Sequence, residues 1–231
     1  MKKTITIIYC LCMLHNFSIA QDEKTSSAGS DNKFYVALSG GAAMPVGNFG
    51  KSNIELSTES GYAKVGYNFN LNSGYQIGKA FGIGGTFFYS KFRINESAIN
   101  DFLDGGSGVT VSADHWQYYG VQIGPTATLS LTKDIYLDFK AFGGIAHVNM
   151  PIIELKGSNG SNVNIGFSKE KWSDAFSWQL GSQLRYNFVP KFFLYTSADY
   201  NYMKPTWSIG NEDVNQKMGV VDINIGLGAN F

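Results

Sequence analysis

Two histidines are the residues of this sequence whose chemistry could serve a catalytic site. A histidine beside a hydroxyl and an acid is the arrangement that activates a nucleophile. His115 adjoins Asp114 and lies near Ser112, but all three belong to a polar loop, and His147 has no serine near it in the sequence. We therefore interpret both histidines as polar surface groups, and catalysis is the least favoured hypothesis.

Six charged side chains form a second set of residues that could have a function. Each lies where apolar and polar residues alternate, and each occupies the polar face. If that face is enclosed, the charges must pair with one another to offset the loss of water. Such pairs either plug a narrow interior or line a path for ions. The six residues are Lys64, Asp138, Lys140, Arg185, Asp199 and Asp222.

Residues 1–20 have the pattern of a secretory signal peptide. Lys2 and Lys3 precede an apolar run from Ile5 to Leu14, and Ser18 to Ala20 provides a small-residue cleavage site. The polar, serine-rich segment 21–32 is expected to be a disordered leader, and residues 33–231 a single domain. After residue 20 no apolar run reaches the roughly 20 residues that a spanning helix needs.

Removal of the signal peptide changes the chemistry of the chain. Both cysteines, Cys10 and Cys12, leave with it, so neither a disulfide nor a cysteine-based metal site is expected. Lys2 and Lys3 also leave, so 16 basic residues remain against 18 acidic ones. This balance argues against nucleic acid as a partner. The acidic second loop lacks the spacing of an EF-hand, and no metal or cofactor is expected.

The elements that must position the charged set are eight segments with apolar residues at every second position. Alternation of this kind indicates β-strands with one apolar and one polar face. The segments are approximately 33–44, 62–77, 81–92, 116–131, 135–147, 174–188, 192–203 and 221–231.

Short and long connections alternate between these segments. Three-residue turns at 78–80, 132–134 and 189–191 alternate with long loops near 45–61, 93–115, 148–173 and 204–217. An even number of strands with one short-turned end predicts an all-β fold, an eight-stranded antiparallel up-and-down transmembrane β-barrel. Pro125 lies inside a strand of this closed sheet and cannot donate to it, so we expect a bulge or kink at Gly124 and Pro125.

The composition of the polar face indicates which side of the barrel meets lipid. A soluble barrel of the lipocalin type would place the apolar face inside. Here the polar face carries mainly Gly, Asn, Gln and Ser, which suits a narrow, hydrogen-bonded interior. Aromatic residues also gather towards both ends of the apolar face, as in the girdles at membrane interfaces. We therefore predict that the apolar face lies in lipid.

The chain resembles the small outer-membrane β-barrel family, which includes OmpX and the membrane domain of OmpA. The resemblance rests on the signal peptide, the eight alternating segments, the Pro45 to Gly50 segment and the terminal Phe231. It implies a location in the outer membrane of a Gram-negative bacterium, in contact with membrane lipid and lipopolysaccharide. The peptidoglycan-binding half of the two-domain members is not expected after Phe231.

The resemblance also implies a role for the last strand. In this family the final strand and its terminal aromatic form a signal read by the outer-membrane assembly machinery. The matching residues here are Val221, Ile223, Ile225, Leu227, Ala229 and Phe231.

The loops suggest surface interactions. In the third loop, apolar residues at 152–155 and 163–167 flank a Gly, Ser and Asn segment, which predicts a hairpin above the membrane. Its exposed edge could pair with an extended partner protein, or the hairpin could merely continue the barrel strands. We expect a non-enzymatic barrel with structural or adhesive loops. A porin-like narrow channel is the alternative, and a lipid A-modifying enzyme is less favoured.

Overall fold

The structure is a computed structural model that describes residues 33–52, 60–78, 80–103, 110–156, 162–165, 171–209 and 212–231. The predicted signal peptide, 1–20, and the predicted leader, 21–32, lie outside the described residues. No helix in the described ranges is long and apolar enough to cross a membrane.

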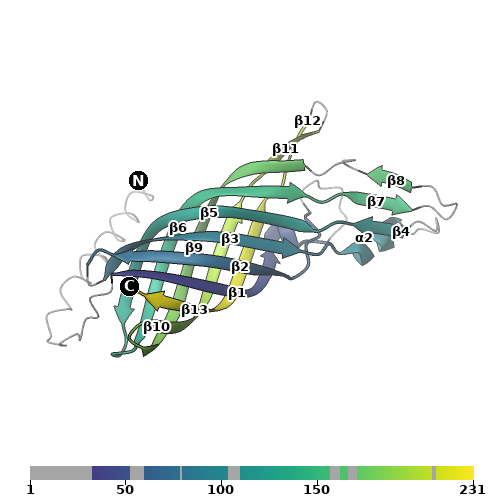
Figure 1. Ribbon diagram of the computed structural model, residues 1–231. Helices are drawn as coiled ribbons and strands as arrows, with labels where there is room; N and C mark the ends of the chain where they lie inside the picture. The colour runs from purple at the N-terminus through teal and green to yellow at the C-terminus, as the bar shows by residue number, and fades with distance from the viewer. Residues whose placement is uncertain are drawn as a thin grey trace, which may run out of the picture.

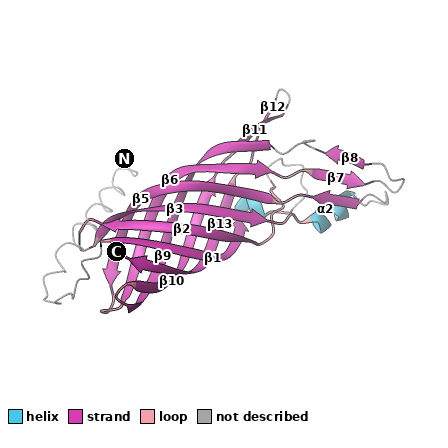
Figure 2. Ribbon diagram, in the orientation of Figure 1, coloured by secondary structure: helices cyan, strands magenta, loops and turns pink. Residues whose placement is uncertain are grey.

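Eight long strands close into one antiparallel barrel (Figures 1 and 2). Each strand pairs with its predecessor in the barrel, and the last strand pairs with the first, from Tyr35 with Asn230 to Val46 with Gly219. The predicted up-and-down fold is confirmed. The barrel strands are β1 (Phe34–Val46), β2 (Gly66–Gln76), β3 (Phe81–Phe92), β5 (Trp116–Ser130), β6 (Ile135–Met150), β9 (Lys171–Val189), β10 (Phe192–Met203) and β13 (Met218–Asn230).

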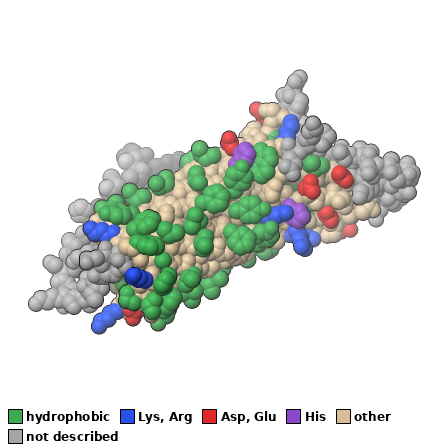
Figure 3. All heavy atoms as spheres, in the orientation of Figure 1, with side chains coloured by type: hydrophobic (Ala, Val, Ile, Leu, Met, Phe, Trp, Pro, Cys, Tyr) green, Lys and Arg blue, Asp and Glu red, His purple; other side chains and the backbone are tan. Residues whose placement is uncertain are grey.

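Side chains on these strands alternate between an exposed outer face and a buried interior. On β13, Ile225 is 64% exposed, whereas the neighbouring Asn224 is 2% exposed. On β1, Leu38 is 65% exposed and Ala37 is 2% exposed. Figure 3 shows the apolar side chains spread over the barrel wall. The apolar face is therefore outside, which rules out the lipocalin-like orientation.

Pro125 is accommodated without a bulge. On β3 the register runs through it, with Ile83 opposite Pro125. On the β6 side, the ladder pairs Ile123 with Gly143 and resumes at Thr126 with Lys140, so two pairs are missing but no residue is inserted. The predicted bulge is wrong because the ladder can open where proline offers no donor and keep its register on both sides.

Smaller elements extend from the end of the barrel opposite the short turns (Figure 1). The predicted hairpin is present, because β7 pairs with β8, and β4 pairs with the other edge of β7. β11 and β12 form a second hairpin. The smaller elements are η1 (Gly47–Gly50), α2 (Glu96–Leu103), β4 (Thr110–Ala113), β7 (Ile153–Lys156), β8 (Asn162–Ile165), β11 (Thr206–Ile209) and β12 (Glu212–Asn215).

Helix α2 lies within the segment that the sequence predicted to be an acidic loop. Its side chains bind the neighbouring strand β4: Glu96 Oε1 accepts from the backbone N–H of Ala113 at 2.9 Å, and Asn100 Oδ1 accepts from that of Val111 at 2.7 Å. Ile99 packs against the buried apolar cluster at the top of the barrel. The acidic residue Glu96 is therefore part of the loop architecture, and Asp104 lies outside the described residues.

Candidate functional site

The middle of the barrel interior is filled by a polar network. Lys140 Nζ on β6 lies 2.9 Å from Asp199 Oδ1 on β10, and both residues are opposite Gly181 of β9. Ser197 Oγ donates to Asp199 Oδ2 at 2.8 Å, and Asn224 Nδ2 donates to the same oxygen at 3.3 Å. The ion pair thus bridges across the intervening strand, through the space that glycine leaves.

Asp222 is held by amides. Its carboxylate accepts hydrogen bonds from Asn68 Nδ2 at 2.8 Å and from Asn201 Nδ2 at 2.7 Å, and it lies directly opposite Asp199 in the β10–β13 register. Amide donors stabilise a buried carboxylate by hydrogen bonding. Asn68 and Asn201 were not predicted as partners of the interior charges, although both occupy the predicted interior face.

Asp138 and Arg185 form the second ion pair, nearer the short turns. Arg185 Nη2 lies 3.2 Å from Asp138 Oδ1, which also accepts from Thr128 Oγ1 at 2.6 Å. The guanidinium carbon lies 5.1 to 5.5 Å from the ring centroids of Tyr35, Tyr136 and Phe193. Cation–π contacts of this kind favour arginine over lysine. The short-turn end of the interior is therefore closed by an ion pair within aromatic rings.

Lys64 does not belong to this group, which corrects the sequence prediction. Its side chain is exposed, and it precedes β2, which begins at Gly66. Before β2 the chain leaves the barrel ladder: Ala63 forms an isolated β-bridge with Ile94, and the backbone turns at Tyr62, whose φ is 51°. The alternating pattern continued past the rim of the barrel, so periodicity alone could not show where the interior ends.

The loop end of the interior is closed by apolar side chains. Phe49, from the short helix η1, is fully buried, and its ring centroid lies 5.2 Å from that of Phe92 and 5.6 Å from that of Trp116. Trp116 Nε1 donates to the carbonyl of Gly61 at 2.8 Å, which ties the chain around Phe49 to the barrel. This layer was not predicted from the sequence. Its other buried members include Tyr118, Met203, Trp207, Met218 and Val220.

The two histidines have different surroundings. His147 lies on the outer face of β6, where its Nδ1 contacts Asp174 Oδ1 and its ring stacks on Trp172, with centroids 4.7 Å apart. Tyr119 completes this surface cluster. His115 is exposed in the connection after β4.

No group of three potential metal ligands occurs among the described residues. The contact between His147 and Asp174 was not predicted from the sequence, although pairing the fifth and sixth predicted strands would have indicated it.

The residues of the predicted assembly signal share the outer face of the last strand. Ile223, Ile225, Leu227 and Phe231 are exposed, and Val221 and Ala229 are partly exposed. Phe231 also closes the barrel, because its backbone N–H donates to the carbonyl of Phe34 at 2.7 Å.

The barrel is a closed sheet without free strand edges, and it carries apolar side chains outside and a polar network in the middle of its interior. A closed sheet with this polarity can cross a bilayer, where no water is available to free strand edges. The chain is a transmembrane β-barrel of the outer-membrane type. Its short turns and Phe231 lie at one end of the wall, and its long loops lie at the other.

Several solved outer-membrane proteins are similar to this barrel. Ail of Yersinia pestis, solved in complex with the heparin analogue sucrose octasulfate, has 18% identity, a TM-score of 0.45 and coverage of 86% of this chain and 99% of its own. Neisserial surface protein A has 12% identity, a TM-score of 0.47 and coverage of 86% and 97%. The β-barrel domain of Pseudomonas aeruginosa OprF has 14% identity, a TM-score of 0.40 and coverage of 87% and 99%. No family model and no curated protein matches the chain.

Proposed function

We propose that this protein is a closed, non-enzymatic barrel that anchors and presents interaction loops at the outer surface of the outer membrane. The observation that carries the proposal is the filling of the interior at three levels. Phe49 and its neighbours fill the loop end, Lys140 and Asp199 the middle, and Arg185 with its aromatic rings the short-turn end. An eight-stranded barrel has room for little more than its own side chains.

Electrical recording in a planar bilayer tests the closed state. The folded protein is expected to give no discrete conductance steps. A Phe49→Ala variant is expected to stay closed as well, because the Lys140–Asp199 pair still fills the middle of the barrel. Discrete steps from the wild-type protein would favour the alternative, a narrow channel for ions or small solutes.

The three-stranded sheet of β4, β7 and β8 is the proposed interaction surface. In the described part of the chain, β7 pairs with strands on both sides, whereas β4 and β8 are the two edges of the sheet. An edge strand offers backbone groups to an extended segment of a partner protein. If the hairpin serves interaction, replacing residues 153–165 by a short Gly-Ser linker should leave the thermal unfolding of the barrel unchanged. A large loss of barrel stability would instead give the hairpin a structural role.

The His147 cluster supports a surface role better than catalysis. His147 contacts Asp174 and the rings of Trp172 and Tyr119, and no serine or threonine hydroxyl is among these contacts. Aromatic and polar groups of this kind commonly occupy the membrane interface. The mass profile of lipid A should therefore be the same in cells that carry the wild-type protein and in cells that carry His147→Ala.

A further inference from the structure

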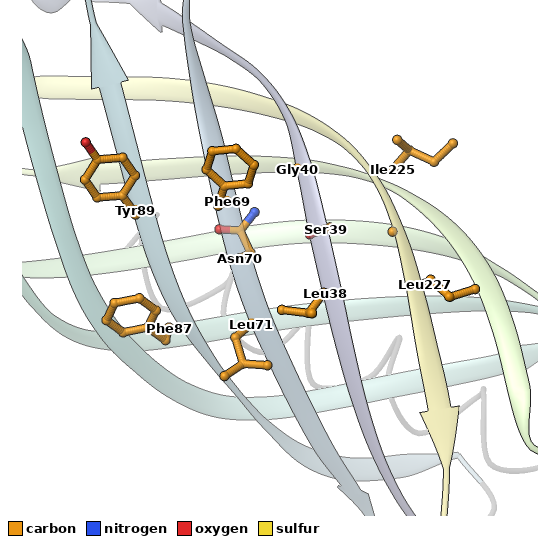
Figure 4. A pocket seen from close by; sticks show the side chains of 11 residues that line it. Leu38, Ser39, Gly40, Phe69, Asn70, Leu71, Phe87, Tyr89, Ile225 and Leu227 are labelled. Atoms are coloured by element: carbon orange, nitrogen blue, oxygen red, sulfur yellow. The ribbon is translucent and has the colours of Figure 1, made fainter.

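The outer wall of the barrel has an apolar groove on one side. It has a volume of about 730 Å³ and lies over β1, β2, β3 and β13. Gly40 forms its floor, and Figure 4 shows Phe69 and Ile225 on either side of that glycine. The strand register explains the arrangement, because Gly40 lies directly between Phe69 of β2 and Ile225 of β13.

The groove is bounded by larger side chains. Leu38 continues β1 towards the short turns and is flanked by Leu71 and Leu227. Phe87 and Tyr89 form the wall on β3, where Tyr89 pairs with Phe69. Because the surroundings are lipid, a hydrocarbon chain is the occupant that these walls fit.

Cations lie directly above the groove. The outward side chains of β3 continue from Phe87 and Tyr89 to Lys91, and Arg93 follows the strand. Arg93 and Lys64 line a second hollow at the rim, about 590 Å³ in volume, and the backbone N–H of Lys64 donates to the carbonyl of Arg93 at 2.8 Å. Neither lysine nor the arginine forms an ion pair with any residue in the described ranges. Within the described part of the chain, no carboxylate competes with an external anion for these three charges.

The three cations lie at one end of the wall. Lys64, Lys91 and Arg93 gather over β2 and β3, on the loop side of the groove. A positive cluster at the level of the headgroups attracts anionic lipid at about 1 kcal/mol per cation. The position of the cluster immediately beyond Tyr89 places it where the headgroup of a lipid lying in the groove would end.

We propose that the outer surface of β1, β2 and β3 binds one phosphorylated lipid of the outer leaflet. Its phosphate lies among Lys64, Lys91 and Arg93, and one of its acyl chains lies in the groove over Gly40. This inference rests on the membrane placement of the barrel wall. It is independent of whether the interior conducts, so a failure here and a failure in the conductance experiment are distinguishable.

Native mass spectrometry of the folded full chain in detergent, with dioleoyl phosphatidic acid as probe, tests the site. The wild-type protein should carry one bound lipid. Gly40→Leu should lower this occupancy, because its side chain enters the groove and its Cβ lies 3.2 Å from Cδ1 of Phe69. Gly143→Leu is the matched control. It lies on the outer face of β6, and its Cβ contacts only the Phe176 ring, at 3.6 Å.

A second set of variants tests the cations of the site. The Lys91→Gln and Arg93→Gln double variant should weaken binding by about fivefold for each cation lost. The Lys133→Gln and Lys191→Gln double variant, at the exposed short turns, is the control and should bind as the wild type does. Dioleoylglycerol should bind weakly, and inorganic phosphate should not displace the phosphatidic acid. Circular dichroism verifies that each variant is folded.

Three results would overturn the proposal. Equal occupancy in Gly40→Leu and Gly143→Leu would mean that the groove does not hold the chain. Displacement of the lipid by inorganic phosphate would mean that the cations form a site for free anions only. A set of several bound lipids that no variant changes would mean that the wall collects lipid without a specific site.

Discussion

Lys140 and Asp199 form their ion pair across Gly181. The lysine and the aspartate come from β6 and β10, and the glycine lies between them on β9. A Cβ atom at Gly181 would collide with Asp199 Oδ1 and lie 2.9 Å from Cε of Lys140. The glycine is therefore a requirement of the interior network, because only a missing side chain leaves the path open.

Gly181→Ala is the smallest change that separates this pair. The added methyl group should force apart two buried charges, and breaking a buried pair costs about 3 kcal/mol or more of unfolding free energy. Urea unfolding in detergent or lipid measures the loss. Gly143→Ala is the control, because its Cβ makes only ordinary contacts. Equal unfolding midpoints for the two variants would mean that the pair adjusts without cost.

A double-mutant cycle measures the coupling between Lys140 and Asp199. Lys140→Met alone leaves a buried carboxylate without its cation, and Asp199→Asn alone leaves a buried ammonium without its anion. The two single changes together should lower the free energy of unfolding by more than the double change does. The expected coupling free energy is about 1–3 kcal/mol. Additive effects would show that the pair contributes no net attraction.

Variants of the terminal aromatic residue, Phe231, distinguish an effect on assembly from an effect on stability. Phe231 and Phe34 pack against each other, with ring centroids 6.2 Å apart, so both belong to the same exposed aromatic pair. Phe231→Ala should reduce the amount of barrel assembled in cells if the last strand is the assembly signal. Phe34→Ala, which removes the same ring contact, should leave assembly near the wild-type level. Quantitative blotting of outer-membrane fractions measures both, and equal losses would assign the effect to packing.

The eight strands could be predicted closely because alternation marks each one twice, by apolar and by polar positions. The segment expected at 81–92 is β3 itself, and 192–203 is β10. The interior charges Asp138, Lys140, Arg185, Asp199 and Asp222 follow from the same pattern. Their pairing does not, because it depends on which strands become neighbours and on where a glycine such as Gly181 leaves space.

The loop end was harder to predict, since periodicity does not show where a strand leaves the barrel. Lys64 continues the pattern of β2 but lies above the rim. Phe49 lies in a segment without alternation and nevertheless fills the barrel mouth. Helix α2 did leave a signal, because Asn95 precedes it and Ile99 and Leu103 are spaced four residues apart. Its eight residues are too few for that signal to stand out.

Lipid contacts the outer side chains of the barrel and does not enter its interior. Single-tryptophan variants that keep either Trp178 or Trp116, with the other tryptophans replaced by Phe, report on the two sides. Trp178 lies on the outer face of β9 beside Tyr200 and Tyr202, whereas Trp116 is 4% exposed inside the barrel. In vesicles of brominated phosphatidylcholine, the fluorescence of Trp178 should be strongly quenched and that of Trp116 should not. Quenching of Trp116 with Trp178 protected would mean that lipid does not contact the predicted outer face.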